Sequence, residues 1–521
     1  MELLLQQLPT IIIIITTLLL LAISIFFAKS RPSTTHNRNT TPPLPPSPPT
    51  KLPLIGHMHH LATGNSSLLP HRALRDLAHK HGPAIMHLQL GQVQTIVVSS
   101  AHIAEAFLKT HDVNFAQRPP AHSADILAYG CTDITSTTFL HRNRDFDCIE
   151  FRSFGSIRSD EVSNLVTAVS SAAASGGSGS GVDLSAMFCK LTYGVLSRAA
   201  FGEATGEGRE AFLPLIDEIT RVATGFNVAD FFPSFKFLQV VTGVAAKLSV
   251  LHRKADEVLE SIIAGHGERK KGSKRPSEEG EGEGEEEVLL DVLLKHRQGE
   301  EDDLGFSLTT DNIKAVLVDL FFAGTETTAT SLEWAMSELV KNPRVMQKAQ
   351  SEVRRAFGPK GNKVDESRLQ ELVYLKMVIR ESMRLHPPVA VLLPRTGAED
   401  CEIGGYHIPA RSSVMVNAWA IGRDPEYWAD PETFWPERFL DSSVDYRGLH
   451  FQLIPFGAGR RICPGMSFAL ANIELPLAWL LYRFDWKLPD GLEPECLDMT
   501  EAFGAAVKRK NGLFLVPNFV A

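Results

Sequence analysis

This 521-residue sequence has few cysteines, no excess of positive charge and no internal repeat. The first two of these features each exclude a class of protein. The six cysteines lack metal-finger spacing and are too few for a disulfide scaffold, so they suit a reducing compartment. A formal net charge of −9 argues against nucleic acid as a partner. With 44% hydrophobic and 22% charged residues, the composition is that of an ordinary globular protein.

Charge is absent from Thr10 to Ala28, an apolar run of about the length that a bilayer-spanning helix requires. A cleaved signal peptide is the alternative. It is the weaker one, because the residues before the run include Glu2 and no Lys or Arg, and the run exceeds a usual signal core. Lys29 and two arginines follow, and positive residues stay on the cytoplasmic side. We therefore expect residues 1–30 to be an uncleaved membrane anchor with a lumenal N-terminus.

Prolines dominate residues 42–49, directly before the globular body. A polyproline ligand for another protein is one interpretation of such a strip. We favour a stiff spacer, because extended proline segments hold a set length between two bodies. The sequence thus predicts a basic and proline-rich hinge over residues 31–56 and one globular domain over residues 57–521.

Within that domain, composition predicts a small sheet and two surface loops. Apolar residues interspersed with Gln and Thr over residues 86–98 indicate the sheet. The Ala-, Ser- and Gly-rich run 172–181 and the opposed charge blocks of 268–287 indicate the loops. The phenylalanines of residues 226–237 either pack in the core or form an apolar mouth that dips into a bilayer.

One predicted helix, Asp311 to Lys341, is unusually long and has a polar interruption. Its middle, residues 323–328, sets a glycine beside three threonines and a carboxylate, which is poor helix material. We expect a local opening there, where a side chain or water enters the hydrogen-bond ladder. Two interpretations stay open: Thr327 and Glu326 deliver protons into a dry pocket, or the threonines back-bond within a kinked helix.

The sequence Pro-Phe-Gly-Ala-Gly-Arg-Arg-Ile-Cys-Pro-Gly over residues 455–465 concentrates residue types that suit a metal ligand. Cys463 stands in a turn of glycines and a proline, with Phe456 and Arg461 before it. A buried thiolate is costly unless a metal neutralises it. Glycines let backbone N–H groups approach the sulfur. The alternative is a buried free cysteine that acts as a small hydrophobe.

Taken together, this loop resembles the haem-binding loop of the cytochrome P450 monooxygenases at every position that defines the signature. The resemblance covers most of residues 43–518 and implies a mostly α fold with small β-sheets (α+β), with haem b between the long helix and the cysteine loop. It implies that Cys463 is the thiolate ligand of the haem iron, which favours O–O cleavage. Arg461 would pair with a haem propionate, and Phe456 would cover the sulfur side of the porphyrin.

Other motifs carry the same resemblance. Glu326 and Thr327 match the acid–alcohol pair of the family residue for residue, and Arg395 matches a cation directed at a propionate. Three further matching residues, Glu381, Arg384 and Arg438, imply a structural clamp that holds the loop ahead of the cysteine. The stretches 389–393 and 499–507 are apolar and are expected beside the substrate pocket, so we expect an apolar substrate.

One window departs from the family pattern. Relatives carry a Trp, and four residues on an Arg, directed at a haem propionate after the loop that caps the pocket. Here no Trp occurs before Trp334, and the corresponding window 132–158 is shorter than the family leads us to expect. Arg142 and Arg144 are the candidate replacements. Haem retention is the property that this departure puts in question.

The strings at residues 321–327 and 417–425 are similar to those of the large plant group of microsomal enzymes of specialised metabolism. That resemblance implies NADPH-dependent hydroxylation of a terpenoid, alkaloid or phenylpropanoid at the endoplasmic reticulum membrane, with the catalytic domain on the cytosolic face. No glycine-rich nucleotide motif occurs, so NADPH–cytochrome P450 reductase is the expected electron donor and cytochrome b5 a second candidate partner. The alternatives are a haem-thiolate isomerase or dehydratase, and a membrane-anchored homologue without working haem.

Overall fold

The computed structural model describes residues 42–62, 69–136, 154–175, 181–202, 206–223, 228–235, 237, 242–273, 287–298, 308–358 and 364–520. The predicted anchor and residues 31–41 of the predicted hinge lie outside these residues, and the bounds of both segments stay predictions. By internal contacts the chain divides into residues 1–43 and 44–521, and every element described below belongs to the second unit. Among the described residues, no helix combines the length and the apolar character needed to cross a membrane.

The expected α+β architecture is confirmed: helices dominate, and the strands are short. The α-helices are α2 (Met58–Ala62), α3 (Pro70–His81), α4 (Ala101–Glu105), α5 (His122–Leu127), α6 (Gly155–Ser175), α7 (Leu184–Phe201), α8 (Gly206–Ala223), α10 (Val244–Ser273), α11 (Leu289–Gln298), α12 (Thr310–Lys341), α13 (Pro343–Phe357), α14 (Val373–Leu385), α15 (Ala418–Ile421) and α16 (Met466–Arg483). The strands are β1 (Ile85–Leu90), β2 (Val93–Val98), β3 (Val182–Asp183), β4 (Arg395–Thr396), β5 (Cys401–Ile403), β6 (Tyr406–Ile408), β7 (Ser413–Val416), β8 (Phe484–Lys487), β9 (Glu501–Ala502), β10 (Lys508–Arg509) and β11 (Phe514–Phe519).

Helix α12 has the bounds that its end signals predict. The Thr309 hydroxyl accepts a hydrogen bond from the backbone N–H of Asn312 at 3.1 Å, and Asn312 Oδ1 accepts from the N–H of Thr309 at 3.0 Å. This reciprocal pair satisfies two N–H groups that have no partner within the helix. At the other end Asn342 is the C-cap, and Pro343 begins α13. Cap residues are local signals, so both ends could be placed from the sequence.

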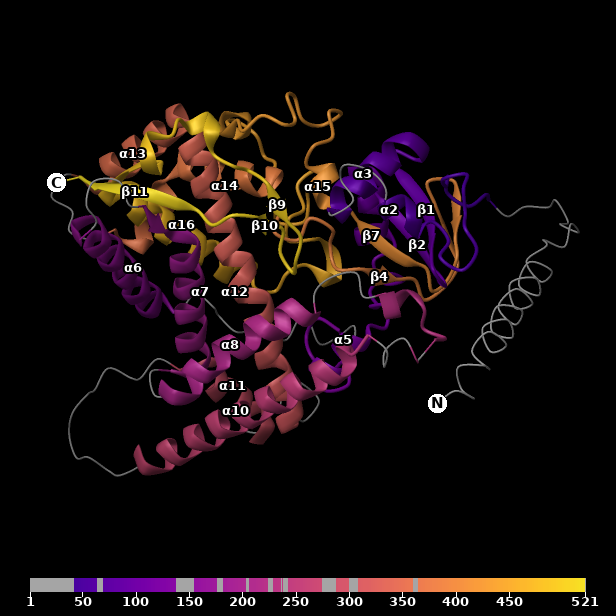
Figure 1. Ribbon diagram of the computed structural model, residues 1–521, viewed down its shortest axis with the longest axis horizontal. Helices are drawn as coiled ribbons and strands as arrows, with labels where there is room; N and C mark the ends of the chain where they lie inside the picture. Colours follow the sequence, from indigo (N-terminus) through magenta and orange to yellow (C-terminus); the bar gives the residue numbers. More distant parts are fainter. Residues whose placement is uncertain are drawn as a thin grey trace, which may run out of the picture. The chain divides into compact units, whose positions relative to one another are not determined.

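Two hydrophobic clusters meet on α12. Its first half contributes Val316 and Phe321 to a cluster with α7, α8, α10 and α11. Its second half contributes Leu332 and Met336 to a cluster with α6, α13, α14 and α16. Trp334, which is fully buried, lies in that second half. Helix α12 therefore runs through the middle of the unit, between α7 and α14 (Figure 1), and its backbone is fixed by packing on several sides.

The largest sheet has the strand order β1-β2-β7-β4. Strands β1 and β2 pair antiparallel, β2 and β7 parallel, and β7 and β4 antiparallel. Figure 1 shows this sheet beside α2, α3 and α15, apart from the helices α6, α13 and α16. The small sheet expected over residues 86–98 is thus confirmed as β1 and β2, and β7 and β4 extend it with residues from the second half of the chain.

Both expected surface loops are partly helical, and the phenylalanine-rich stretch is divided between core and surface. Helix α6 runs to Ser175, so residues 172–175 of the expected loop are helical, in accord with the high helix propensity of alanine. Helix α10 runs to Ser273, so residues 268–273 continue a helix and only the later charge blocks lie outside the described residues. In the phenylalanine-rich stretch, Phe231 and Phe232 pack in the core, whereas Phe235 and Phe237 are exposed; contact of the exposed pair with a bilayer stays a prediction.

The capping pair at the start of α12 leads to a stability prediction. Thr309→Ala removes the side-chain acceptor for the Asn312 N–H, and we expect it to lower the free energy of unfolding by about 1 kcal/mol. Thr309→Ser keeps an acceptor at the same place and serves as the control. Thermal or urea unfolding of both variants measures the effect, and an equal loss in the two would contradict the capping role.

Candidate active site

The Cys463 loop has a tight backbone that glycine makes possible. The N–H of Cys463 donates to the carbonyl of Phe456 at 2.9 Å, which closes the loop, and residues 459–461 form a single 3-10 turn. Gly459 has φ +66°, and a Cβ at this position would lie 1.9 Å from the carbonyl oxygen of Leu108. Any other residue would clash with that backbone as well as strain its own. The loop ends at Gly465, where α16 begins.

The sulfur of Cys463 is largely shielded from solvent water, and this decides its protonation. Desolvation raises the pKa of the Cys463 thiol to about 11, although a hydrogen bond from the backbone N–H of Gly465 acts in the opposite direction. Without a cation beside it, the thiol is therefore neutral at neutral pH. A thiolate at this place requires a positive partner such as a metal ion.

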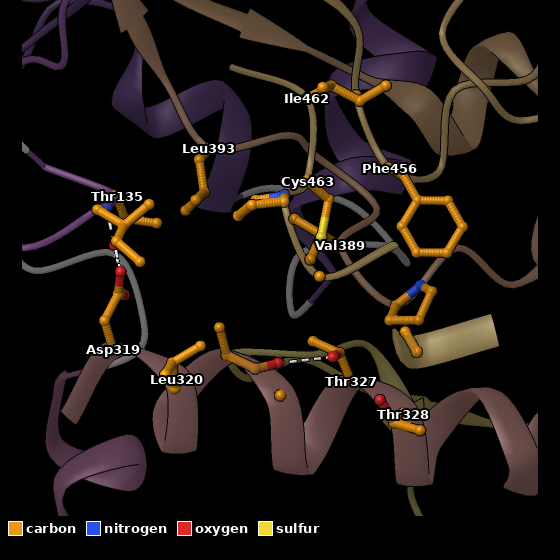
Figure 2. A pocket seen from close by; sticks show the side chains of 18 of the residues that line it. Thr135, Asp319, Leu320, Thr327, Thr328, Val389, Leu393, Phe456, Ile462 and Cys463 are labelled. Atoms are coloured by element: carbon orange, nitrogen blue, oxygen red, sulfur yellow. Dashed lines mark hydrogen bonds between the residues drawn. The ribbon is translucent and has the colours of Figure 1, made fainter. Parts of the chain in front are cut away.

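Cys463 lines a cavity of about 260 Å³ whose opposite wall is α12 (Figure 2). Most of the side chains around it are apolar. They come from the segments before α6, from α7, α11 and α12, from the stretch after α14, from the Cys463 loop and from the start of α16. Its apolar lining includes Ile134, Leu196, Val316, Leu320, Val389, Leu392, Leu393, Phe456, Ile462 and Phe468. Such a pocket favours apolar ligands with few polar groups.

The α12 wall of the cavity contains Thr327 but not Glu326. The hydroxyl of Thr327 donates to the carbonyl of Ala323 at 2.6 Å (Figure 2), so the side chain enters the hydrogen-bond ladder by back-bonding. The helix remains α-helical throughout residues 310–341, so the expected local opening is not found. Glu326 points to another side, where its Oε1 accepts from Lys508 Nζ on β10 at 2.9 Å.

Three arginines line the cavity and repel one another. Desolvation and the charges of Arg395 and Arg461 lower the pKa of Arg118 to about 9. Desolvation, with a contribution from Arg461, lowers the pKa of Arg395 to about 10, and desolvation also lowers the pKa of Arg461. All three stay charged at neutral pH. Arg118 was missed at the sequence level, where a cation between Gln117 and Pro119 gives no signal of a cavity-lining role.

These residues fit a haem. The group carries iron, which would neutralise a thiolate at Cys463, and two propionates, which would neutralise charge on the three arginines. Arg395 supports this directly: its Nη2 donates to the carbonyl of Ala458 at 2.7 Å, whereas its buried Nη1 has no partner among the described residues. Phe456 also lines the cavity and packs edge-on against Tyr446, with ring centroids 5.7 Å apart.

The structure brings the three predicted clamp residues together. Glu381 Oε2 accepts from Arg384 Nε at 2.7 Å, and Glu381 Oε1 accepts from Arg438 Nε at 3.0 Å and from the N–H of Trp435 at 2.8 Å. Arg384 also donates to the carbonyls of Gly422 and Pro431. The buried carboxylate is thereby fully supplied with donors, as a buried ion pair requires. The clamp ties α14 to the segment that precedes the Cys463 loop.

The remaining predicted site residues line the cavity only in part. Of the stretch 389–393, Val389, Leu392 and Leu393 line the cavity. No residue of 499–507 lines it, but the N–H of Val507 donates to the carbonyl of Pro388, which does. Arg142 and Arg144, the candidate replacements for a missing propionate cation, lie outside the described residues.

Comparison with known proteins agrees with this arrangement. The family model described as cytochrome P450 matches residues 45–516. The chain belongs to the cytochrome P450 family. The family implies a haem with a cysteine thiolate ligand and oxidoreductase activity of the monooxygenase type, so the P450 resemblance found in the sequence is confirmed.

This P450 is similar in sequence to several curated proteins from plants. It is 48% identical over 494 residues to desmethyl-deoxy-podophyllotoxin synthase of Sinopodophyllum hexandrum, with 93% of each chain covered. It is 45% identical over 489 residues to salviol synthase of Salvia pomifera, again with 93% of each chain covered. With germacrene A hydroxylase of Barnadesia spinosa the identity is 46% over 476 residues, 90% of this chain and 91% of the other.

Among solved structures, a zebra fish cytochrome P450 with progesterone matches at a TM-score of 0.70 and 26% sequence identity. The match covers 87% of this chain and 100% of the other. A second structure of a zebra fish cytochrome P450, with abiraterone, has a TM-score of 0.68 over the same share of this chain. The fold is therefore that of the P450 family.

The clamp generates a prediction with a matched control. Glu381→Gln leaves Arg384 and Arg438 without their carboxylate, and we expect the free energy of unfolding to fall by about 3–5 kcal/mol, with loss of haem-containing protein. Glu371 pairs with Arg368 at the same three-residue spacing, but that pair is exposed. Glu371→Gln should leave thermal unfolding unchanged, because exposed pairs contribute little. Equal losses of stability in the two variants would contradict the claim that the clamp stabilises the protein because it is buried.

Proposed function

We propose that this P450 inserts one oxygen atom from O₂ into a C–H bond of an apolar terpenoid, alkaloid or phenylpropanoid, with electrons from NADPH through a separate reductase. The observation that carries the proposal is the apolar cavity with Cys463 on one side and Thr327 on the other (Figure 2). The names of similar plant proteins, which include a hydroxylase of germacrene A and a tabersonine 6,7-epoxidase, support the substrate classes.

Each residue of the site has a proposed part. Bound haem supplies the activation of O₂. Cys463 would hold its iron, and Arg118, Arg395 and Arg461 would hold its propionates. The apolar walls exclude water from the substrate, which strengthens every electrostatic interaction inside the pocket. Thr327 would hold a proton at its hydroxyl beside the substrate, because Thr327 lines the cavity.

Glu326 is suited to supply protons to Thr327 from outside the cavity. Its Oε1 pairs with Lys508, whose side chain is exposed, whereas its Oε2 is buried and has no partner among the described residues. One carboxylate thus reaches from the surface into the protein interior, directly before Thr327 in the chain. We assign it the role of carrying protons inward, as a positioned general acid and base.

We also propose that residues 1–30 anchor the protein in the endoplasmic reticulum membrane, with the globular unit on the cytosolic face and NADPH–cytochrome P450 reductase, with or without cytochrome b5, as redox partner. Exposed apolar side chains support contact with lipid. Leu54 and Phe237 are 52% and 59% exposed. Their segments meet at the β1–β2 turn, where Ile55 and Phe231 accept hydrogen bonds from Gly91 and Gln92. Such a patch suits a bilayer surface.

The role of Thr327 leads to a test of the reaction class. We expect Thr327→Ala to keep NADPH oxidation by the reductase-reconstituted enzyme but to lower product formed per NADPH about tenfold, because a proton donor at the cavity is lost. Thr327→Ser retains the hydroxyl and should retain most of the coupling. A binding screen that follows the haem spectrum with terpenes, alkaloids and flavonoids selects the candidate substrates for this assay.

The same assay separates the alternatives. A haem-thiolate isomerase or dehydratase would form product without consuming NADPH or O₂. Wild-type turnover independent of NADPH would therefore overturn the proposed monooxygenase. Unchanged coupling in Thr327→Ala would leave the reaction class in place and refute the role of the hydroxyl.

A further inference from the structure

Two carboxylates and one hydroxyl join α12 to the segment 133–136 at the edge of the cavity. The backbone N–H of Thr135 donates to Asp319 Oδ2 at 3.1 Å. The Thr135 hydroxyl also makes a short hydrogen bond with Asp319 Oδ1 and lies 2.7 Å from Asp133 Oδ2. Figure 2 shows Asp319 pointing from α12 toward Thr135. We call Asp319, Thr135 and Asp133 the carboxylate bridge.

In the carboxylate bridge, the Thr135 hydroxyl contacts two carboxylates but has only one proton to donate. A threonine hydroxyl has a single proton, and an ionised carboxylate can only accept. Thr135 Oγ1 therefore cannot satisfy Asp133 and Asp319 together while both are ionised. One additional proton resolves this: Asp319 Oδ1–H donates to Thr135 Oγ1, and Thr135 Oγ1–H donates to Asp133 Oδ2. All contacts are then pairs of one donor and one acceptor.

The surroundings place that proton on Asp319. Asp133 is buried and also accepts from the N–H and from the hydroxyl of Ser136, each at 3.2 Å, so it is the carboxylate better supplied with donors. Desolvation and the charge of Asp133 raise the pKa of Asp319 to about 7, against the opposing effects of the hydrogen bonds from Thr135 and of the charge of Arg118. Within the part of the chain that the structure describes, Arg461 and Cys131 also interact electrostatically with Asp133, and Cys463 interacts with Asp319.

Backbone carbonyls of the segment that the bridge holds accept hydrogen bonds from two of the three cavity arginines. The carbonyl of Thr135 accepts from Arg118 Nε at 3.1 Å, and the carbonyl of Ile134 accepts from Arg461 Nη1 at 3.3 Å. We propose that Asp319 is a positioning residue, which holds residues 133–136 through a proton shared with Asp133 and thereby sets Arg118 and Arg461 for the haem propionates. The choice of haem as the anionic partner rests on the proposed function.

A dependence on pH follows, with a definite sign. The folded-state pKa of Asp319, about 7, lies above the ordinary value of 3.8, so the folded protein keeps a proton that the unfolded chain loses. The stability that this proton provides is fully present below about pH 4 and is lost as the pH rises through about 7. Above that pH, Asp133 and Asp319 repel each other and the segment loosens from α12.

The test measures the transfer of haem from the purified holoenzyme to apomyoglobin. Between about pH 6 and pH 8, on either side of the Asp319 pKa of about 7, we expect the wild-type rate to rise about tenfold. Asp319→Asn should give a rate independent of pH, because the amide can donate to Thr135 Oγ1 and accept from its N–H at any pH. Thr135→Val should release haem fast at both pH values, and Thr135→Ser should restore the wild-type profile.

Asp311→Asn, at the exposed start of the same helix, is the matched control and should behave as wild type. The proposal is overturned if Asp319→Asn keeps the wild-type pH dependence, or if Thr135→Val holds haem as well as wild type does. A merely structural role of Asp319 would predict faster haem loss in Asp319→Asn at every pH, without a change in profile.

A second measurement tests the shared proton independently of any bound cofactor. The infrared difference spectrum of wild type minus Asp319→Asn, recorded at about pH 6, below the Asp319 pKa, should contain the carbonyl stretch of a protonated carboxylic acid. Absence of that band refutes the shared proton. A wild-type protein that holds no haem would instead refute the proposed function, and the two failures are thus distinguishable.

Discussion

The negative charge on the sulfur of Cys463 is the constraint on which the rest of the site depends. Shielding from water makes the thiolate unfavourable, and burial is the main cause that raises the pKa of the thiol to about 11. Only a cation at the sulfur reverses this. The loop, the glycines within it and the start of α16 place the sulfur at the cavity wall, where the iron of a haem can supply that charge. The cavity arginines show the opposite imbalance, since three like charges meet there and the propionates of the same haem would compensate them.

Two separate supports hold the walls of this site. On the sulfur side, the carboxylate of Glu381 gathers Arg384 and Arg438 and ties α14 to the segment before the cysteine loop. On the α12 side, Asp319 ties the central helix to the segment 133–136, whose carbonyls orient Arg118 and Arg461. Both supports use a carboxylate away from bulk water whose partners must all be present. A fixed helix and a fixed loop then face each other across an apolar cavity.

Local signals explain what could be predicted from the sequence. The ends of α12 could be placed because the capping residues Thr309 and Asn342 act within one turn of the helix. The cysteine loop could be recognised because its residue types follow one another in the chain. The side chain that Glu326 meets could not be predicted, because Lys508 is 182 residues away. The link from Asp319 to Thr135 spans 184 residues, and an acidic residue in a long helix indicates no partner by itself.

Composition also failed to predict where two helices end. The Ala- and Ser-rich residues 172–175 and the charged residues 268–273 were expected in loops, and each continues a helix that began far earlier. The departure of residues 132–158 from the family pattern left the propionate cations uncertain from sequence alone. Arg118, before that window, lines the cavity together with Arg395 and Arg461, a grouping that only the folded chain reveals.

The bond between Cys463 and iron is tested most directly by the absorption difference spectrum of the reduced protein with carbon monoxide. The wild-type protein, produced with ample haem, should give the long-wavelength Soret band of a thiolate-ligated haem, and Cys463→Ser should lose it. A wild-type spectrum without that band, or a Cys463→Ser spectrum that retains it, would contradict the account.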